Sequence, residues 1–284
     1  MKIRMIRSLC WGLAAITVTM AVYSCRKESS ASGNAGLTTT RPTQMKIYLT
    51  DDQSLVFDKV MIDLQKVEVK LEDNGVDSLG GWFNLNITPG VYDILKLRNG
   101  LDTLFATGTI PANRKLQKLR LTLGTNNSVE KNGQPFPLKI KDKNNEVIVK
   151  LDESNVDFSA PDQFMFWLDF DAGKSIKVDN SGSGNNNGFE LRPQIRAFAK
   201  SKAGEIEGRV LPAAAQPVVL AINGTDTATA KPEREGEFKI VGLKAGTYTV
   251  IFDATAGNYK DTTINNVVVR NGEDTHLPVV TLKQ

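Results

Sequence analysis

The chain has 284 residues, which is enough for two domains of ordinary size. It carries 35 basic and 32 acidic residues, but Lys2, Arg4 and Arg7 lie in an N-terminal segment that we expect to be removed. Without those three, basic and acidic residues both number 32. A neutral chain offers no electrostatic argument for a nucleic-acid partner, and we expect none.

Residues 1–24 have the pattern of an export signal. Basic residues precede an apolar run, Leu9 to Tyr23, which is shorter than the roughly 20 residues of a membrane-spanning helix. The run ends in Val22-Tyr23-Ser24-Cys25, which resembles the lipobox of bacterial lipoproteins, although Tyr23 is larger than the usual residue there. The resemblance implies cleavage before Cys25 and its acylation, with palmitate among the acyl groups. The alternative is an ordinary cleaved signal that leaves Cys25 as a free thiol.

Cysteine use narrows the possible chemistry. Cys10 lies in the predicted signal and Cys25 is the predicted lipid site, so no thiol remains for a disulfide, a metal site or a nucleophile. We expect a lipid-anchored protein of the cell envelope, at the outer membrane of a Gram-negative bacterium. Both the periplasmic face and the surface face of that membrane are compatible with the sequence. Residues 25–43 are rich in Ser, Thr, Gly and Asn, and predict a flexible tether.

From Gln44 onwards the pattern changes to short strands. Over 60–71 the apolar positions switch from even to odd numbers near Gln65-Lys66, which predicts a β-bulge or two shorter strands meeting at a kink. Asn132-Gly133 predicts a tight hairpin turn. Further strands are predicted over 45–49, 82–85, 90–97, 119–123, 135–140, 147–151, 164–171 and 189–198.

Two segments stand apart in this pattern. The run Phe164 to Asp171 is apolar on both faces, which is typical of a central strand. Residues 101–113 have no clear period and are compatible with a helical turn. Many short strands without a sustained helical period predict an all-β fold with two antiparallel β-sandwich domains, over 44–200 and 204–284.

The first domain contains ordered blocks that resemble a known family. They are Tyr48-Leu49-Thr50-Asp51, Tyr92 to Leu97, Asn99-Gly100, Leu119 to Gly124, Asn132-Gly133-Gln134, Asp169 to Ala172, and Leu191 to Ala197. Together they are similar to an uncharacterised domain-of-unknown-function family of bacterial lipoproteins. The resemblance implies an envelope location and a β-rich fold, and it carries no activity. The sequence departs from the family at Asp52-Gln53, where a small residue or proline is expected.

The second domain follows a glycine-punctuated pattern. Gly236-Glu237-Phe238-Lys239-Ile240 and Gly242 to Val250 match G-x-F-x-I and G-L-x-A-G-x-Y-x-V. They resemble the carboxypeptidase-regulatory-like, prealbumin-type module, which implies a seven-strand Greek-key sandwich without peptidase residues. Such modules serve as spacers or docking units. Phe238 and Tyr248 fall in phase with the apolar positions of their strands, so we expect both in the core.

Acidic residues are the main candidates for chemistry. Asp169 and Asp171 are spaced i, i+2, which places both on one face of a strand, and Asp51 and Asp52 lie in a predicted turn. These four are weak candidates for calcium ligands, and Asp169 with Asp171 could also act as an acid/base pair. A solvated strand end is the simpler interpretation. His276, the single histidine, is expected to be structural, since no cysteine can join it in a zinc site.

Two aromatic residues are weak candidates for ligand binding. Trp82 and Tyr259 could stack on a sugar, although Trp82 also suits a hydrophobic plug. Trp167, beside Met165 and Leu168, is expected in the core.

The sequence therefore favours a non-enzymatic, lipid-anchored envelope protein that binds a glycan or an envelope protein, with no cofactor. The alternatives are a structural spacer in an envelope complex, and a hydrolase or calcium-dependent module that uses the Asp169/Asp171 region.

Overall fold

A computed structural model describes residues 37–51, 57–73, 81–140, 145–158, 160, 162–179 and 188–284. The predicted signal, Cys25 and Asp52 lie outside these residues, so the lipidation of Cys25 stays a prediction. Residues 34–284 belong to one compact unit. Among the residues described, no helix has the length and apolar character that crossing a membrane requires.

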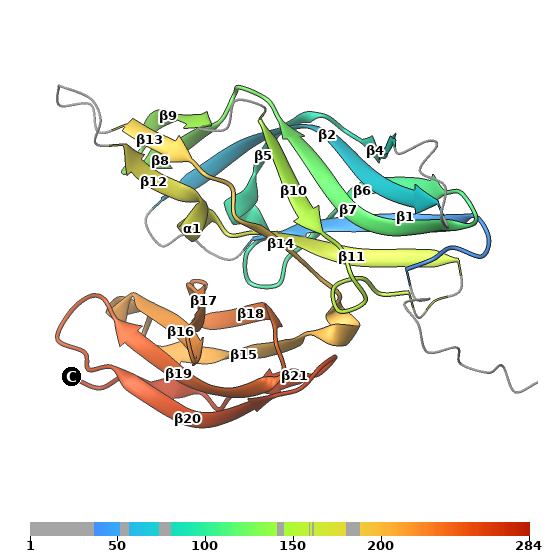
Figure 1. The fold of residues 1–284 in the computed structure, drawn as a ribbon. Coiled ribbons are helices and arrows are strands. Elements are labelled where there is room, and N and C mark those ends of the chain that lie inside the picture. Colours follow the sequence, from blue (N-terminus) through green and yellow to red (C-terminus); the bar gives the residue numbers. More distant parts are fainter. Residues whose placement is uncertain are drawn as a thin grey trace, which may run out of the picture. The chain divides into compact units, whose positions relative to one another are not determined.

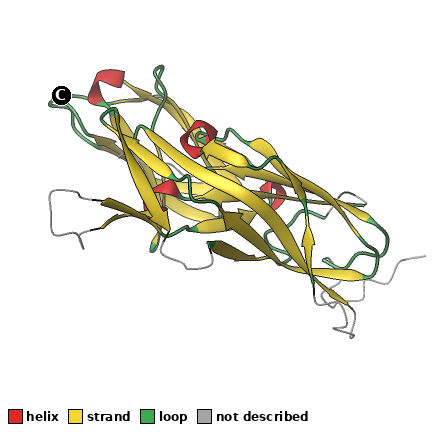
Figure 2. Cartoon of the chain, turned by 90° about the horizontal axis from the view of Figure 1, so that it is seen from above, coloured by secondary structure: helices red, strands yellow, loops and turns green. Residues whose placement is uncertain are grey.

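Strands make up most of the described chain, and the helical segments are short (Figures 1 and 2). In chain order the elements are β1 (Thr43–Thr50), β2 (Lys59–Asp73), β3 (Trp82–Asn84), β4 (Asn86–Ile87), β5 (Gly90–Asp93), the 3-10 helix η1 (Ile94–Leu97), β6 (Thr103–Ile110), β7 (Arg114–Leu123), β8 (Ser128–Lys131), β9 (Gln134–Ile140), β10 (Glu146–Lys150), β11 (Gln163–Phe170), α1 (Ala172–Ser175), β12 (Ile176–Asp179), β13 (Gly188–Leu191), β14 (Ile195–Phe198), η2 (Lys200–Lys202), β15 (Gly204–Leu211), η3 (Ala213–Ala215), β16 (Pro217–Asn223), β17 (Asp226–Ala230), β18 (Glu237–Leu243), β19 (Gly246–Ala254), β20 (Thr262–Val269), β21 (Asp274–His276) and β22 (Val280–Thr281).

The first sandwich is built from two sheets with one apolar core. One sheet has the order β14-β11-β1-β6-β4, and the larger sheet has the order β10-β7-β2-β8-β9-β13-β12, with β3 and β5 also paired to β2. Side chains from both sheets form the core. The predicted β-sandwich is confirmed, but the pairing is not purely antiparallel, since β1 runs parallel to β11 and β9 runs parallel to β13.

Strand β11 is central, as its sequence predicts. It lies between β1 and β14, and Phe166 and Phe170 on its inner face are completely buried. Its outer face is also covered, because Trp167 is 6% exposed and stacks against Tyr48 and Phe198 at centroid distances of 4.9 and 6.2 Å. Burial on both faces explains why the strand shows no polar alternation.

Strand β2 is one continuous strand of 15 residues, and its pairing register with β7 shifts between Leu64 and Lys66. The bulge alternative is thus confirmed. Residues 94–97 form η1 in place of the end of a predicted strand, and residues 103–110, expected to be compatible with a helical turn, form β6. The predicted strand 189–198 is divided into β13 and β14.

The last part of the predicted tether is packed against the first sandwich. Leu37 is buried in the core, and the N–H of Thr39 donates to the carbonyl of Arg114 at 2.8 Å. Burial of the Leu37 side chain in the core holds the backbone around it in place. The polar composition of residues 25–43 did not indicate this contact.

The second sandwich also has two sheets. One has the order β18-β15-β21, with β22 also on β15, and the other has the order β17-β16-β19-β20. Phe238 and Tyr248 are 3% and 4% exposed in its core, which confirms their expected role. Gly236 has a φ of +87°, and a Cβ there would lie 2.2 Å from the carbonyl oxygen of Val210, so glycine is required at this turn.

The family block Leu119 to Gly124 ends in a glycine for a steric reason. A Cβ at Gly124 would lie 2.1 Å from Oδ2 of the buried Asp63. Gly124→Ala is therefore expected to lower the free energy of unfolding by about 1–3 kcal/mol, measured by urea denaturation. Gly90→Ala is the matched control, because a Cβ at Gly90 meets nothing within 4 Å. Equal stabilities of the two variants would contradict this explanation.

Candidate functional site

Of the predicted acidic candidates, Asp51, Asp169 and Asp171 lie near one another, but Asp169 and Asp171 do not share one strand face. β11 ends at Phe170, and Asp171 instead caps α1. Oδ1 of Asp171 accepts the N–H of Lys174 at 2.8 Å, and Oδ2 pairs with the Lys174 ammonium at 2.7 Å. The expectation that Asp169 and Asp171 lie on one face is wrong, because the chain turns into α1 between them.

Asp51 and Asp169 are both buried at the parallel β1–β11 pair, where Thr50 is in register with Asp169. Oδ1 of Asp51 accepts the N–H of Ala172 at 3.3 Å. Asp52 lies outside the described residues. The described candidate carboxylates thus make contacts with other groups of the protein. Calcium binding stays a prediction.

Asp169 has a cationic partner in Arg196. The Asp169 side chain is 1% exposed, and its Oδ2 lies 2.7 Å from Nε of Arg196. The same guanidinium donates from Nη1 to the carbonyl of Gly242 at 2.7 Å and from Nη2 to that of Val241 at 3.4 Å. A buried carboxylate needs such a partner, so the pair is structural. Sequence reasoning included Arg196 in a family block but did not find its role.

Trp82 is partly buried on the outer face of the larger sheet. The Arg120 guanidinium lies 4.2 Å from the centroid of its ring, a cation–π contact. Nε of Arg120 also donates to Oε2 of the buried Glu68 at 2.8 Å. One face of the Trp82 ring is therefore occupied by Arg120, which reduces the area available for stacking on a sugar.

In the second sandwich, Tyr259 packs partly against the core. Nδ1 of the exposed His276 lies 2.7 Å from Oε1 of Glu207, and Asp274 offers a further ligand atom, all three within 4.8 Å of one another. Sequence reasoning missed this group because the parallel pairing of β15 and β21 brings distant residues together.

The ammonium of Lys239 already forms ion pairs with the carboxylates of this group and with Glu205 beside it. It lies 2.6 Å from Glu205 and 2.9 Å from Glu207. Burial lowers the pKa of Lys239, but hydrogen bonds and attraction from the two glutamates outweigh burial, so the pKa is raised well above its ordinary value. A bound metal ion would have to compete with this permanent cation.

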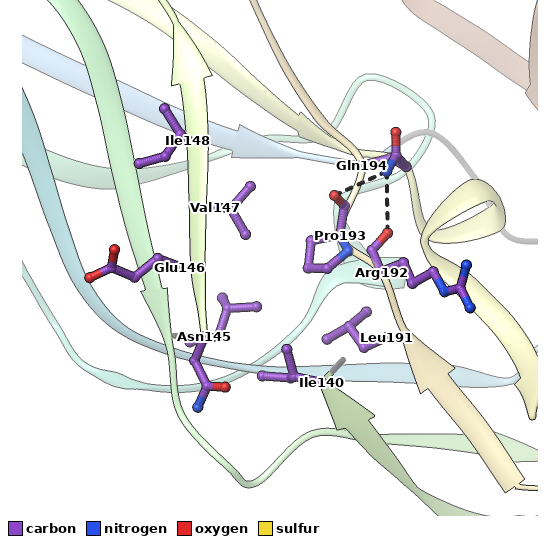
Figure 3. A pocket seen from close by; sticks show the side chains of 10 residues that line it. Ile140, Asn145, Glu146, Val147, Ile148, Leu191, Arg192, Pro193 and Gln194 are labelled. Atoms are coloured by element: carbon purple, nitrogen blue, oxygen red, sulfur yellow. Dashed lines mark hydrogen bonds between the residues drawn. The ribbon is translucent and has the colours of Figure 1, made fainter. Parts of the chain in front are cut away.

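A cleft of about 400 Å³ opens beside β10 in the first sandwich (Figure 3). We call it the β10 cleft. Val147 projects from β10 toward the segment that joins β13 to β14, where Pro193 and Gln194 lie on the other side. Apolar and polar side chains both line it, namely Leu123, Ile140, Asn145, Glu146, Val147, Ile148, Leu191, Arg192, Pro193 and Gln194. Because four separate segments contribute, no local motif indicated it.

β10 is the edge strand at one end of the larger sheet. Among the described strands it pairs with β7 alone, and β14 of the smaller sheet lies close to it without pairing. The N–H of Leu123 donates to the carbonyl of Asn145, and the N–H of Leu151 donates to that of Gln117, so odd-numbered residues face β7. In an antiparallel ladder the intervening residues direct their N–H and C=O groups away. The open edge therefore consists of Glu146, Ile148 and Lys150, and the Ile148 side chain is 49% exposed.

The comparisons with known proteins identify the first sandwich. Residues 42–193 match the family model described as Domain of unknown function (DUF4382), and the chain belongs to this family. A search of curated proteins found no match. The family description carries no activity, so the site must be interpreted from its geometry.

Solved structures resemble the chain only at low TM-scores in the examples that follow. A type II cohesin–X-dockerin complex from Acetivibrio cellulolyticus is 25% identical over 28% of this chain and 56% of that chain, with a TM-score of 0.23. The Bacillus anthracis TIE protein is 11% identical over 85% of this chain and 39% of its own, with a TM-score of 0.23. A variant of the shaft pilin spaA from Lactobacillus rhamnosus GG is 9% identical over 87% of this chain and 99% of its own, with a TM-score of 0.23. The matches thus span less than two thirds of the first two chains.

Arg196→Met is expected to lower the free energy of unfolding by about 2–4 kcal/mol, because it leaves the Asp169 carboxylate buried without its cation. Asp169→Asn combined with Arg196→Met should recover part of this loss, since no charge is then buried. Urea denaturation of the single and double variants measures both effects. An additive result, with no recovery in the double variant, would show that the pair does not act as proposed.

Acid should destabilise the chain through Glu68. Burial raises the pKa of Glu68, but hydrogen bonds from Lys66 and Arg120 outweigh burial, so the pKa lies below its ordinary value of 4.5. Such a carboxylate stabilises the fold above its unfolded pKa and loses that contribution as the pH falls through the folded pKa. Glu68→Gln should therefore show a smaller drop in unfolding free energy between about pH 5 and pH 2. Identical pH profiles would refute the assignment.

Proposed function

We propose that this chain is a non-enzymatic, lipid-anchored protein of the cell envelope whose first sandwich binds another protein by strand addition. The observation that carries this proposal is the open edge of β10 beside the β10 cleft. An extended segment that adds to a sheet edge gains main-chain hydrogen bonds, and neighbouring pockets supply specificity. The β10 cleft offers apolar side chains next to main-chain groups that no described strand pairs with, which is the combination that this mode of recognition needs.

The envelope location rests on the sequence before the described residues. Export-signal features, and the lipobox resemblance that ends at Cys25, support a lipid anchor at the outer membrane of a Gram-negative bacterium. The second sandwich would then act as a spacer or docking unit, as its resemblance to prealbumin-type modules implies. Hydrogen bonds from Arg196 to the carbonyls of β18 join the two sandwiches. They would help to hold one sandwich against the other.

The other interpretations have less support in the geometry. A glycan platform on Trp82 would have to share the ring with Arg120, and Tyr259 packs partly on the second core. A hydrolase based on Asp169 and Asp171 would need carboxylates that are paired with Arg196 and Lys174. A spacer without a ligand gives no role to the open edge of β10.

The anchor is tested by Cys25→Ala. The variant is expected to lose palmitate labelling and to leave the membrane fraction, because the alanine cannot carry an acyl chain. Fractionation of cells that produce the full chain measures this, with Cys10→Ala as the matched control. If the Cys25→Ala chain still sediments with membranes, another anchor must be found.

Strand addition is tested with a photo-crosslinking amino acid in place of Gln194, at the mouth of the β10 cleft. We expect the full chain in cells to crosslink to a protein, and Ile148→Lys to abolish the product, since a charge on the edge blocks pairing. A crosslinker in place of Val279, which is 60% exposed in the second sandwich, is the control. Equal crosslinking from the two positions would overturn this function.

A further inference from the structure

We propose that the strand added to the open edge is β10 of a second copy of the chain, so that the two larger sheets join across a two-fold axis. This inference rests on the proposed function, because it names the partner of the same edge. The evidence is the order of side chains along Glu146-Val147-Ile148-Val149-Lys150 and the direction of their main-chain groups.

Charge along β10 is self-complementary in one register. When two copies run antiparallel with Ile148 opposite Ile148, each Glu146 faces Lys150 of the other copy. A two-fold interface brings the same patch of both copies together, so one favourable ion pair occurs twice. Opposite charges facing each other across paired strands stabilise a sheet, and like charges destabilise it.

Hydrogen-bonding geometry selects the same register. Glu146, Ile148 and Lys150 are the residues whose N–H and C=O groups point away from β7. With Ile148 on the two-fold axis, these even-numbered residues oppose one another. The two Ile148 residues can exchange both hydrogen bonds, and the N–H of each Lys150 can donate to the carbonyl of Glu146 in the other copy. A register shifted by one residue would place Glu146 opposite Val149 and lose the ion pairs. The carbonyl of Lys150 already accepts Nδ2 of Asn155 at 3.1 Å, and its N–H is directed to the edge.

The side chains on the outer face fit this pairing. Lys150 lies opposite Lys118 of β7, which in turn lies opposite Lys70 of β2, so a row of three lysines ends at the open edge. Glu146 of a second copy would place a carboxylate at the end of this row. Glu146 has a longer contact within its own chain, 3.5 Å to Arg120, and the second carboxylate oxygen can accept Lys150 of the partner.

Apolar contact completes the interface. The Ile148 side chain is half exposed, and it would meet its copy on the two-fold axis. Directly opposed aliphatic side chains on paired strands contribute to sheet stability. The charged residues at both ends of β10 would disfavour partners with any other charge order, which gives the edge specificity.

Cysteine crosslinking tests the geometry in the full chain. Ile148→Cys chains in membranes of producing cells should be joined by a short bis-maleimide into a product of twice the chain's mass. The parent chain measures the background from Cys10 and Cys25, and Val279→Cys is the control at an exposed position elsewhere. Val178→Cys probes β12, the other open edge of the same sheet. A doubled product that forms at Val178 and not at Ile148 would overturn the proposal, as would no doubled product.

Charge reversal tests the register. Lys150→Glu places carboxylates opposite each other twice per dimer, and should reduce the Ile148→Cys product roughly tenfold or more. Glu146→Lys should have the same effect by pairing ammonium groups. The double variant Glu146→Lys, Lys150→Glu restores both ion pairs in exchanged positions and should restore the product. No rescue in the double variant would overturn this register.

The outcome also separates this inference from the proposed function. If the crosslinker in place of Gln194 captures a different envelope protein, and Ile148→Lys abolishes that product, strand addition is upheld and self-pairing is refuted. Both proposals fail if the photo-crosslinker in place of Gln194 and the cysteine in place of Ile148 each give no product above their controls.

Discussion

The buried carboxylate of Asp169 is the constraint on which the arrangement of β11, β14 and β18 depends. A charge that is 1% exposed requires a cation, and Arg196 supplies it from the neighbouring strand. The remaining guanidinium N–H groups then reach the carbonyls of Val241 and Gly242. Satisfying one carboxylate thus fixes β14 in its sheet and holds the edge of the second sandwich against it.

The covered outer face of β11 follows from the same arrangement. Trp167 stacks between Tyr48 and Phe198, and its Nε1 donates to Asp102 at 2.7 Å. The aromatic stack removes this face from solvent, so the smaller sheet is buried on both sides at β11. On the larger sheet, Ile148 of β10 remains half exposed among the described residues, and the proposed surface for a partner lies at this strand.

An open edge is a hazard unless its pairing is controlled. Here Glu146 and Lys150 place opposite charges at the two ends of an apolar strand, which admits a partner with the reversed order and disfavours others. The same residues would thus protect against aggregation and select the partner. The proposed recognition by this chain's first sandwich requires neither a metal nor a catalytic group.

Local features of the fold were predictable because local sequence determines them. The switch of apolar phase at Gln65-Lys66 indicated the bulge in β2, and Asn132 and Gly133, with φ of 53° and 72°, form the hairpin turn between β8 and β9. The apolar run of β11 indicated its central position.

Other features depend on tertiary contacts that no short pattern records. One example is η1, which forms where a continued strand was expected. The hydroxyl of Thr50 donates to the carbonyls of Leu97 and Leu101, at the end of η1 and shortly after it. The parallel pairing of β1 with β11 joins segments more than a hundred residues apart, and it places Asp51 beside Asp169. The β10 cleft has the same origin, because its walls come from four separate parts of the chain.

Amide hydrogen exchange along β10 tests the central claim most directly. At low concentration of the full chain, the amides of Val147 and Val149, bonded to β7, should be protected, while those of Glu146, Ile148 and Lys150 exchange fast. Raising the concentration should slow the three even-numbered amides and leave the odd-numbered ones unchanged. Fast exchange at Glu146, Ile148 and Lys150 at every concentration would contradict pairing between two copies at this edge.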